Sequence, residues 1–84
     1  MLFRSGDRTL LVVEPRGRPD DRALVAIARS LAWARPEEVV AIRRFPLDRR
    51  HDAKVDYPGL RRMLDARRWM LRAPVAHAVP VEQR

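Results

Sequence analysis

The amino-acid sequence predicts a small α+β domain of the order (β)βαβ–loop–α, with a two- to three-stranded sheet flanked by helices. Two short runs rich in Val, Leu and Ile are separated by a segment whose apolar residues recur at helical spacing. The chain has 84 residues, enough for one domain and no more. We therefore expect residues 1–71 to form one domain and residues 72–84, which contain two prolines, to be an irregular tail.

Two strands are predicted from the apolar runs. The first covers residues 9–14 and ends at Pro15, and residues 2–4 precede a turn-forming Ser-Gly-Asp, so they are placed to pair with it as a hairpin arm. The second covers residues 39–42, after which Pro46 takes the chain out of the sheet because proline cannot donate to a ladder. At least one edge of such a sheet is left unprotected, which indicates that a partner, the tail of the chain or a second copy of the chain covers it.

Two helices are predicted from periodicity. One runs from Asp21 to Ala34, with Asp20 as its N-cap, and its apolar stripe is Leu24, Ile27, Ala28 and Leu31. The other covers residues 58–71, starts with a proline suited to the first helical turn, and places on one face Leu60, Met63, Leu64 and Leu71. Residues 48–57 between strand and helix are dense in charge and lack periodicity, so they are predicted to be a loop with a brief extended piece at 54–56.

The composition excludes several classes of protein. There is no Cys, so neither a disulfide framework nor a Cys-based metal site is possible. The chain has no apolar stretch near the ~20 residues that a bilayer span needs and no hydrophobic signal core at its start, so we expect a cytoplasmic protein with no membrane partner. Seventeen of the eighteen basic residues are Arg, and Lys54 is the one Lys.

The net charge of +7 is compatible with nucleic acid, an anionic small molecule or an acidic protein as partner. No helix-turn-helix or ribonucleoprotein-type motif is present, and no aromatic residues interleave the basic segments, so the sequence disfavours nucleic acid. The basic residues of the second helix are typical of a solvated face, although phosphate contacts or an acidic partner surface remain open for Arg61, Arg62, Arg67 and Arg68.

Residues 45–61 resemble the closing motif of the adenylate-forming enzymes, which include acyl-CoA synthetases, adenylation domains and luciferases. The motif consists of a proline, polar residues, a small residue, Lys, a β-branched residue, Asp and a later Leu, and these places are filled by Pro46, Lys54, Val55, Asp56 and Leu60. Residues 50–55 are more similar still to the β-lactone synthetase and fatty acyl-AMP ligase branch. The upstream order of strand, helix, strand and motif loop is also similar to the C-terminal lid domain of these enzymes.

The resemblance implies a function. The family activates a carboxylic acid with ATP and Mg²⁺, and the lid closes over a larger N-terminal domain. This chain would then complete in trans the active site of a separately encoded large domain, which would bind most of the ATP and Mg²⁺, and it would not be active alone. Lys54 would stabilise charge in adenylation, and the candidates for substrate or nucleotide contact are Arg50, His51 and Asp56.

Two alternatives accompany that hypothesis. His51 also suits a surface or capping position, and the carboxylates of Asp48, Asp52 and Asp56 match no strong metal motif, so no metal site is expected. The usual Gly before the motif lysine is Ala53 here.

A function of another class is a non-catalytic basic interaction module, related to such a lid, that binds an acidic protein or nucleic acid through its Arg-rich helices.

Overall fold

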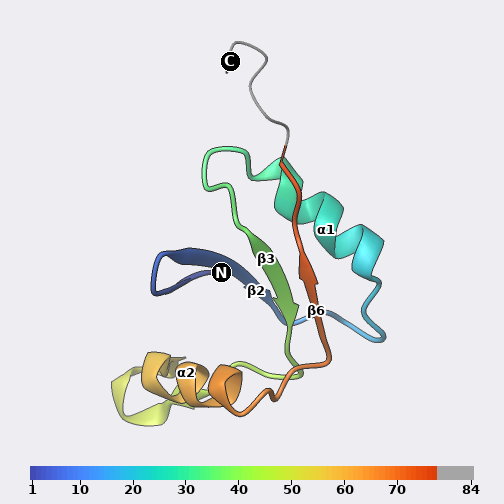
Figure 1. Ribbon diagram of the computed structural model, residues 1–84. Coiled ribbons are helices and arrows are strands. Elements are labelled where there is room, and N and C mark those ends of the chain that lie inside the picture. Colours follow the sequence, from blue (N-terminus) through green and yellow to red (C-terminus); the bar gives the residue numbers. More distant parts are fainter. Residues whose placement is uncertain (78–84) are drawn as a thin grey trace.

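A four-stranded mixed sheet with one helix on each face makes up the body of the computed structural model, which describes residues 1–77 (Figure 1). The strand order is β1-β2-β3-β6. The bounds are β1 Leu2–Ser5, β2 Arg8–Val13, β3 Glu38–Ala41 and β6 Leu71–Pro74. The predicted α+β class is confirmed.

The connections follow the local sequence. β1 and β2 pair antiparallel through a two-residue turn, in which Gly6 supplies the positive φ of 64° that such hairpins need. Helix α1 (Asp21–Ser30) then returns the chain so that β3 lies parallel to β2, and the Asp20 carboxylate caps the helix by accepting from the Arg22 N–H at 3.0 Å. β6 runs antiparallel on the other side of β3.

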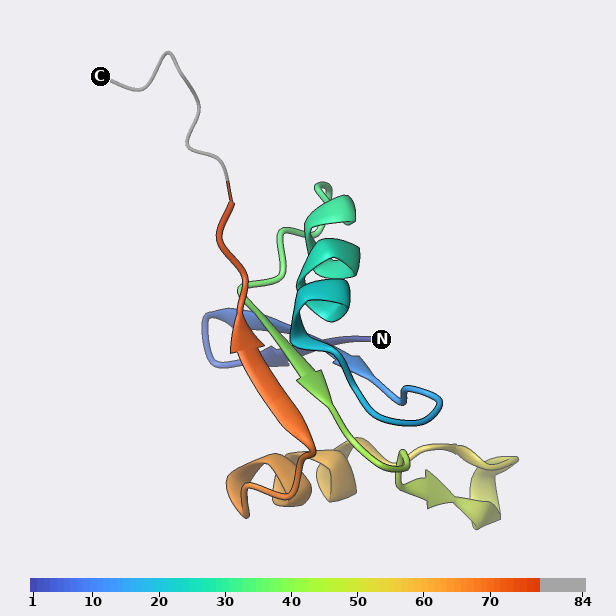
Figure 2. The same ribbon diagram turned by 90° about the vertical axis from the view of Figure 1, so that its right-hand side faces the viewer.

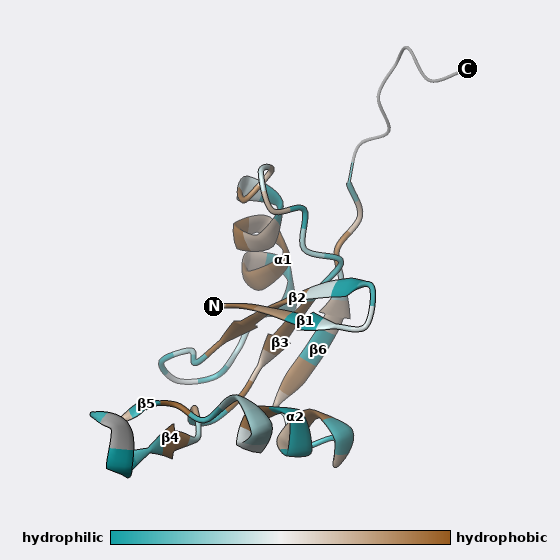
Figure 3. Cartoon of the chain, turned by 90° about the vertical axis from the view of Figure 1, so that its left-hand side faces the viewer, coloured by the Kyte–Doolittle hydropathy of each residue, from teal (hydrophilic) through white to brown (hydrophobic). Residues whose placement is uncertain are grey.

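The central strands β2 and β3 are buried on both faces. Alternate residues of β2 and β3 pack with Leu24 and Ala28 of α1 on one face, and the intervening residues pack with Leu60 and Leu64 of α2 (Tyr57–Asp65) on the other. Figure 3 shows the two helices on opposite sides of the strands. Double burial explains why both strands appear in the sequence as continuous apolar runs rather than as alternating ones.

The predicted tail from residue 72 was wrong in its first part. Residues 72–74 belong to β6, and Ala41 pairs with Leu71 while Val39 pairs with Ala73. Leu71 and Ala73 are half-buried on the α1 face, whereas Arg72 and Pro74 are exposed. The rest of the predicted tail from residue 78 lies outside the described residues.

Both helices are shorter than predicted. α1 ends at Ser30, and α2 ends at Asp65, so Leu71 lies in a strand and not on a helical stripe. The end of α2 is fixed by Arg67, whose φ of 58° is left-handed, and by N–H donation from Arg68 to the Met63 carbonyl at 2.9 Å. This is the Schellman motif, built here without glycine.

The predicted loop 48–57 contains a small second sheet. Strands β4 (Leu47–Asp48) and β5 (Lys54–Val55) form a short hairpin around the 3-10 turn η1 (Arg49–His51). Figure 2 shows this hairpin standing off from the main sheet, past the end of β3. None of the helices in residues 1–77 is long and apolar enough to cross a membrane.

Candidate functional site

The candidate site is the β4–β5 hairpin and the start of α2. The Asp56 N–H donates to the Pro46 carbonyl at 2.8 Å, which joins the two ends of the hairpin, and the side chain of Glu14 ties this base to the body by accepting from the Phe45 N–H at 2.8 Å. The ring of Phe45 packs against the core cluster on the α2 face. The hairpin is therefore an arm with a fixed base rather than a free loop.

Lys54 lies in β5, where it pairs with Asp48 of β4. Its side chain is exposed, and the ammonium makes no ion pair with any of the residues that the structure describes. The two preceding residues, Asp52 and Ala53, both have left-handed backbones, with φ of 56° and 55°. This tight turn directs the chain back into β5 and fixes the backbone position of Lys54.

Ala53 occupies a backbone conformation that favours glycine. A non-glycine residue with φ near 55° is strained by its Cβ, whereas Asp tolerates this region better than most. The glycine that adenylate-forming enzymes usually have before the motif lysine would relieve this strain. Ala53, which stands in the place of that glycine, therefore keeps the turn but lowers its stability.

The other predicted site residues lie on the same segment. Arg50 donates its N–H to the Asp48 carboxylate at 3.0 Å, and its Nε lies 3.7 Å from the same oxygen while the side chain is 89% exposed. His51 completes η1, and its side chain lies outside what the structure describes. The hairpin thus carries Arg50, His51 and Lys54 within five consecutive residues.

Asp56 has a structural function in this fold. Its Oδ1 accepts from the Gly59 N–H at 3.0 Å and so caps α2, while its Oδ2 lies 3.9 Å from Nη2 of Arg62. A side chain at Gly59 would meet that carboxylate, since its Cβ would lie 2.5 Å from Oδ2. The sequence Asp-Tyr-Pro-Gly therefore sets the angle at which α2 leaves the hairpin.

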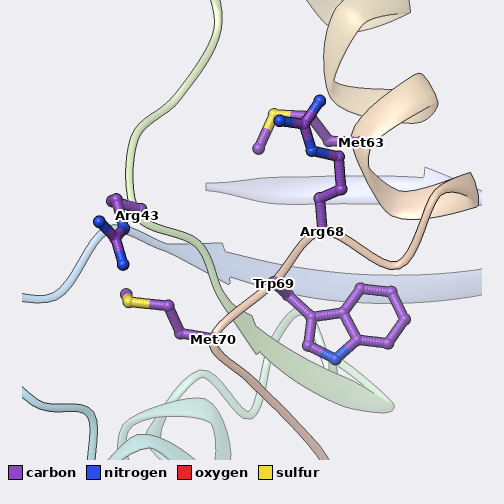
Figure 4. A pocket seen from close by; sticks show the side chains of 5 residues that line it. All are labelled: Arg43, Met63, Arg68, Trp69 and Met70. Carbon is purple, nitrogen blue, oxygen red and sulfur yellow. The ribbon is translucent and has the colours of Figure 1, made fainter.

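A second feature was missed by sequence reasoning. An open pocket of about 450 Å³ lies where β3 ends and the chain enters β6. It is lined by Arg43, Met63, Arg68, Trp69 and Met70 (Figure 4). These residues come from three separate segments that only the pairing of β3 with β6 brings together, so periodicity within one segment could not have shown them.

Trp69 also borders a second hollow, at which Glu38 organises a small charged cluster. The carboxylate accepts from Nε and Nη2 of Arg72 and lies 3.1 Å from Nη2 of Arg8, with only 11% of its side chain exposed. The hydrogen bond from Arg72 is the main reason that the pKa of Glu38 lies below its usual value, and burial opposes it. The Arg72 guanidinium also stacks 4.8 Å from the centroid of the Trp69 ring.

Among the side chains that the structure describes, which do not include that of His51, no group of three or more His, Asp or Glu is arranged to hold a metal ion. The chain matches no protein-family model, no curated protein and no solved structure.

Proposed function

We propose that this chain is a lid-like subdomain that completes in trans the active site of an adenylate-forming ligase. In this function a separate large domain binds the carboxylic acid, ATP and Mg²⁺, and the hairpin brings Lys54 to the reacting groups. The observation that carries the proposal is the position of Lys54. It is the one Lys of an Arg-rich chain, it is exposed on strand β5 of the hairpin, and it lies within residues 45–61, which resemble the closing motif.

The chemistry suits a lysine. Attack of a carboxylate on the α-phosphate gathers negative charge in the transition state, and a cation aimed at that charge in a closed site lowers the barrier. An ammonium on a flexible stem can approach as a compact point charge, whereas guanidinium is planar and bulkier. The exposure of Lys54 supports the proposal because the lysine must enter a second protein's site.

The position of the hairpin also supports docking of this kind. It stands off from the main sheet (Figure 2), so a larger domain can receive it without disturbing the core. The hydrogen bond from the Asp56 N–H to the Pro46 carbonyl holds its two ends together, and the Asp56 carboxylate caps the helix that follows. The chain would thus contribute one positioned cation, and the partner would contribute the rest of the site.

The test is complementation. The chain is mixed with a separately produced adenylate-forming large domain from the same genome, with ATP, Mg²⁺ and a panel of carboxylic acids, and pyrophosphate release is followed. Addition of this chain is expected to raise the rate above that of the large domain alone. A rate that does not rise with any acid and any such domain contradicts the proposal.

A further inference from the structure

We propose that the pocket lined by Arg43, Met63, Arg68, Trp69 and Met70 binds an acidic peptide segment of a partner protein. One apolar side chain of that segment would sit against the methionines and the indole, and flanking carboxylates would reach the two arginines. The proposal concerns a different surface from the Lys54 hairpin and does not depend on the adenylation function.

The pocket has a rigid backbone. The Arg68 N–H donates to the Met63 carbonyl at 2.9 Å, which closes the Schellman motif, and the Met70 N–H donates to the Ala41 carbonyl at 2.8 Å. Both ends of the three-residue wall from 68 to 70 are therefore held by the fold. A pre-organised wall loses little conformational entropy when a ligand binds.

The indole of Trp69 is fixed from behind. It packs against the core cluster on the α2 face, and the guanidinium of Arg72, itself held by Glu38, stacks over the ring at 4.8 Å. The ring is only half-buried, so part of it remains available at the pocket. A rigid, partly exposed Trp is a frequent anchor of protein interfaces.

The charges of the pocket are unsatisfied within the described chain. The guanidinium groups of Arg43 and Arg68 are exposed and make no ion pair with residues 1–77. Figure 4 shows Met70 beside Arg43 and Met63 beside Arg68, with the indole of Trp69 on the other side of the backbone. Two cations beside apolar side chains suit a ligand that is both anionic and partly apolar.

An acidic peptide fits better than a small molecule. The pocket is open, and Met70 keeps 38% of its surface exposed, so a small ligand would stay largely in water, whereas enclosed ligand sites bury most of their ligand. Arg, Trp and Met are the residue types enriched at protein interfaces, and methionine adapts its shape to varied partners. The net charge of +7 would also steer an acidic partner toward the chain.

The probe is a synthetic peptide with one central leucine flanked on each side by three Glu or Asp residues. Binding is measured through the fluorescence of Trp69 in a Trp33→Phe background, because Trp33 is 78% exposed and would otherwise mask the signal. We expect saturable binding that weakens with added salt. A peptide with serine in place of the leucine should bind at least about fivefold more weakly, because the apolar contact is lost.

Variants locate the site. Arg43→Gln and Arg68→Gln should each weaken binding by about fivefold, as expected for loss of one charged contact at a partly exposed site. The matched control is Arg4→Gln with Arg35→Gln, which removes the same charge at the opposite end of the parallel strands. A fold check by circular dichroism accompanies each variant.

Three results would overturn the proposal. Equal losses in a double variant, Arg43→Gln with Arg68→Gln, and in the double control would mean attraction by net charge alone. Equal affinity for the leucine and serine peptides would mean that the leucine side chain makes no favourable contact with the pocket. Displacement of the peptide by a single-stranded oligonucleotide whose own binding depends on Arg43 and Arg68 would assign the surface to nucleic acid instead.

Discussion

Replacing Glu38 by Gln tests whether the cluster of Arg8, Glu38 and Arg72 stabilises the fold. Glu38 is the one charged residue among the buried residues that the structure describes, and its carboxylate has one guanidinium bound through two nitrogens and a second at 3.1 Å. Hydrogen bonds to a charged group contribute about 1.5–3 kcal/mol, against roughly 1 kcal/mol for neutral ones. Because glutamine keeps one acceptor oxygen, we expect a loss of about 1–2 kcal/mol.

The change is measurable by thermal unfolding at pH 7. In a domain of this size 1 kcal/mol shifts Tm by about 4–8 °C, so Glu38→Gln should lower Tm by roughly 4–16 °C. The neighbouring Glu37→Gln is the matched control, because that side chain is 45% exposed and its ion pair with Arg8 is long, at 3.6 Å. The control should stay within about 0.5 kcal/mol of the wild type.

The pH dependence provides an independent check. The pKa of Glu38 is lowered in the folded state, mainly by the hydrogen bond from Arg72, from an ordinary value of 4.5. A carboxyl of this kind stabilises the fold fully above its unfolded pKa and loses that contribution as the pH falls through its folded pKa. The difference between wild type and Glu38→Gln should therefore shrink below about pH 4. Equal unfolding free energies at pH 7, or a difference that does not shrink in acid, would refute the reasoning.

Two further changes test the turn and the cap. Ala53→Gly should raise the unfolding free energy measured in urea by roughly 0.5 kcal/mol, because it removes the strain of a residue with φ 55°; a loss of stability would contradict this. Gly59→Ala should cost about 1–2 kcal/mol, because its Cβ would lie 2.5 Å from the capping carboxylate of Asp56. In an Asp56→Ala background, which itself loses about 1 kcal/mol, Gly59→Ala should become neutral or stabilising, since alanine favours the helix; an unchanged cost in that background would mean that the clash is elsewhere.

Much of the body of the fold was predictable from the sequence. β2 and β3 are buried on both faces and so appear as apolar runs. α1 has a strong cap at Asp20, and of its predicted apolar stripe Leu24 and Ala28 are buried, whereas Ile27 is exposed. These signals are local, because burial and capping act over a few neighbouring residues. The position of Lys54 between β3 and α2 was predictable because the apolar run of β3 and the start of α2 are both local signals.

The remaining features depend on contacts that are distant in the sequence. β6 has four residues and only Leu71 and Ala73 face the sheet's α1 side, so it lacks the pattern of a longer strand. α2 stops because Arg67 adopts a left-handed backbone, for which the sequence offers no glycine as a signal. The pocket beside Trp69 exists only because β6 returns next to β3, and no local pattern announces that pairing.

The proposed function of Lys54 is measured by comparing variants of the chain in the complementation assay. The chain with Lys54→Ala should support pyrophosphate release about 10²–10³-fold more slowly than the wild type, the scale expected for one lost transition-state contact. Lys54→Arg should not restore the rate, because guanidinium differs from ammonium in shape. Arg49→Ala, which removes an exposed charge from the same hairpin, should retain a rate close to that of the wild type. If the Lys54→Ala chain supports the wild-type rate, Lys54 does not have the function assigned to it.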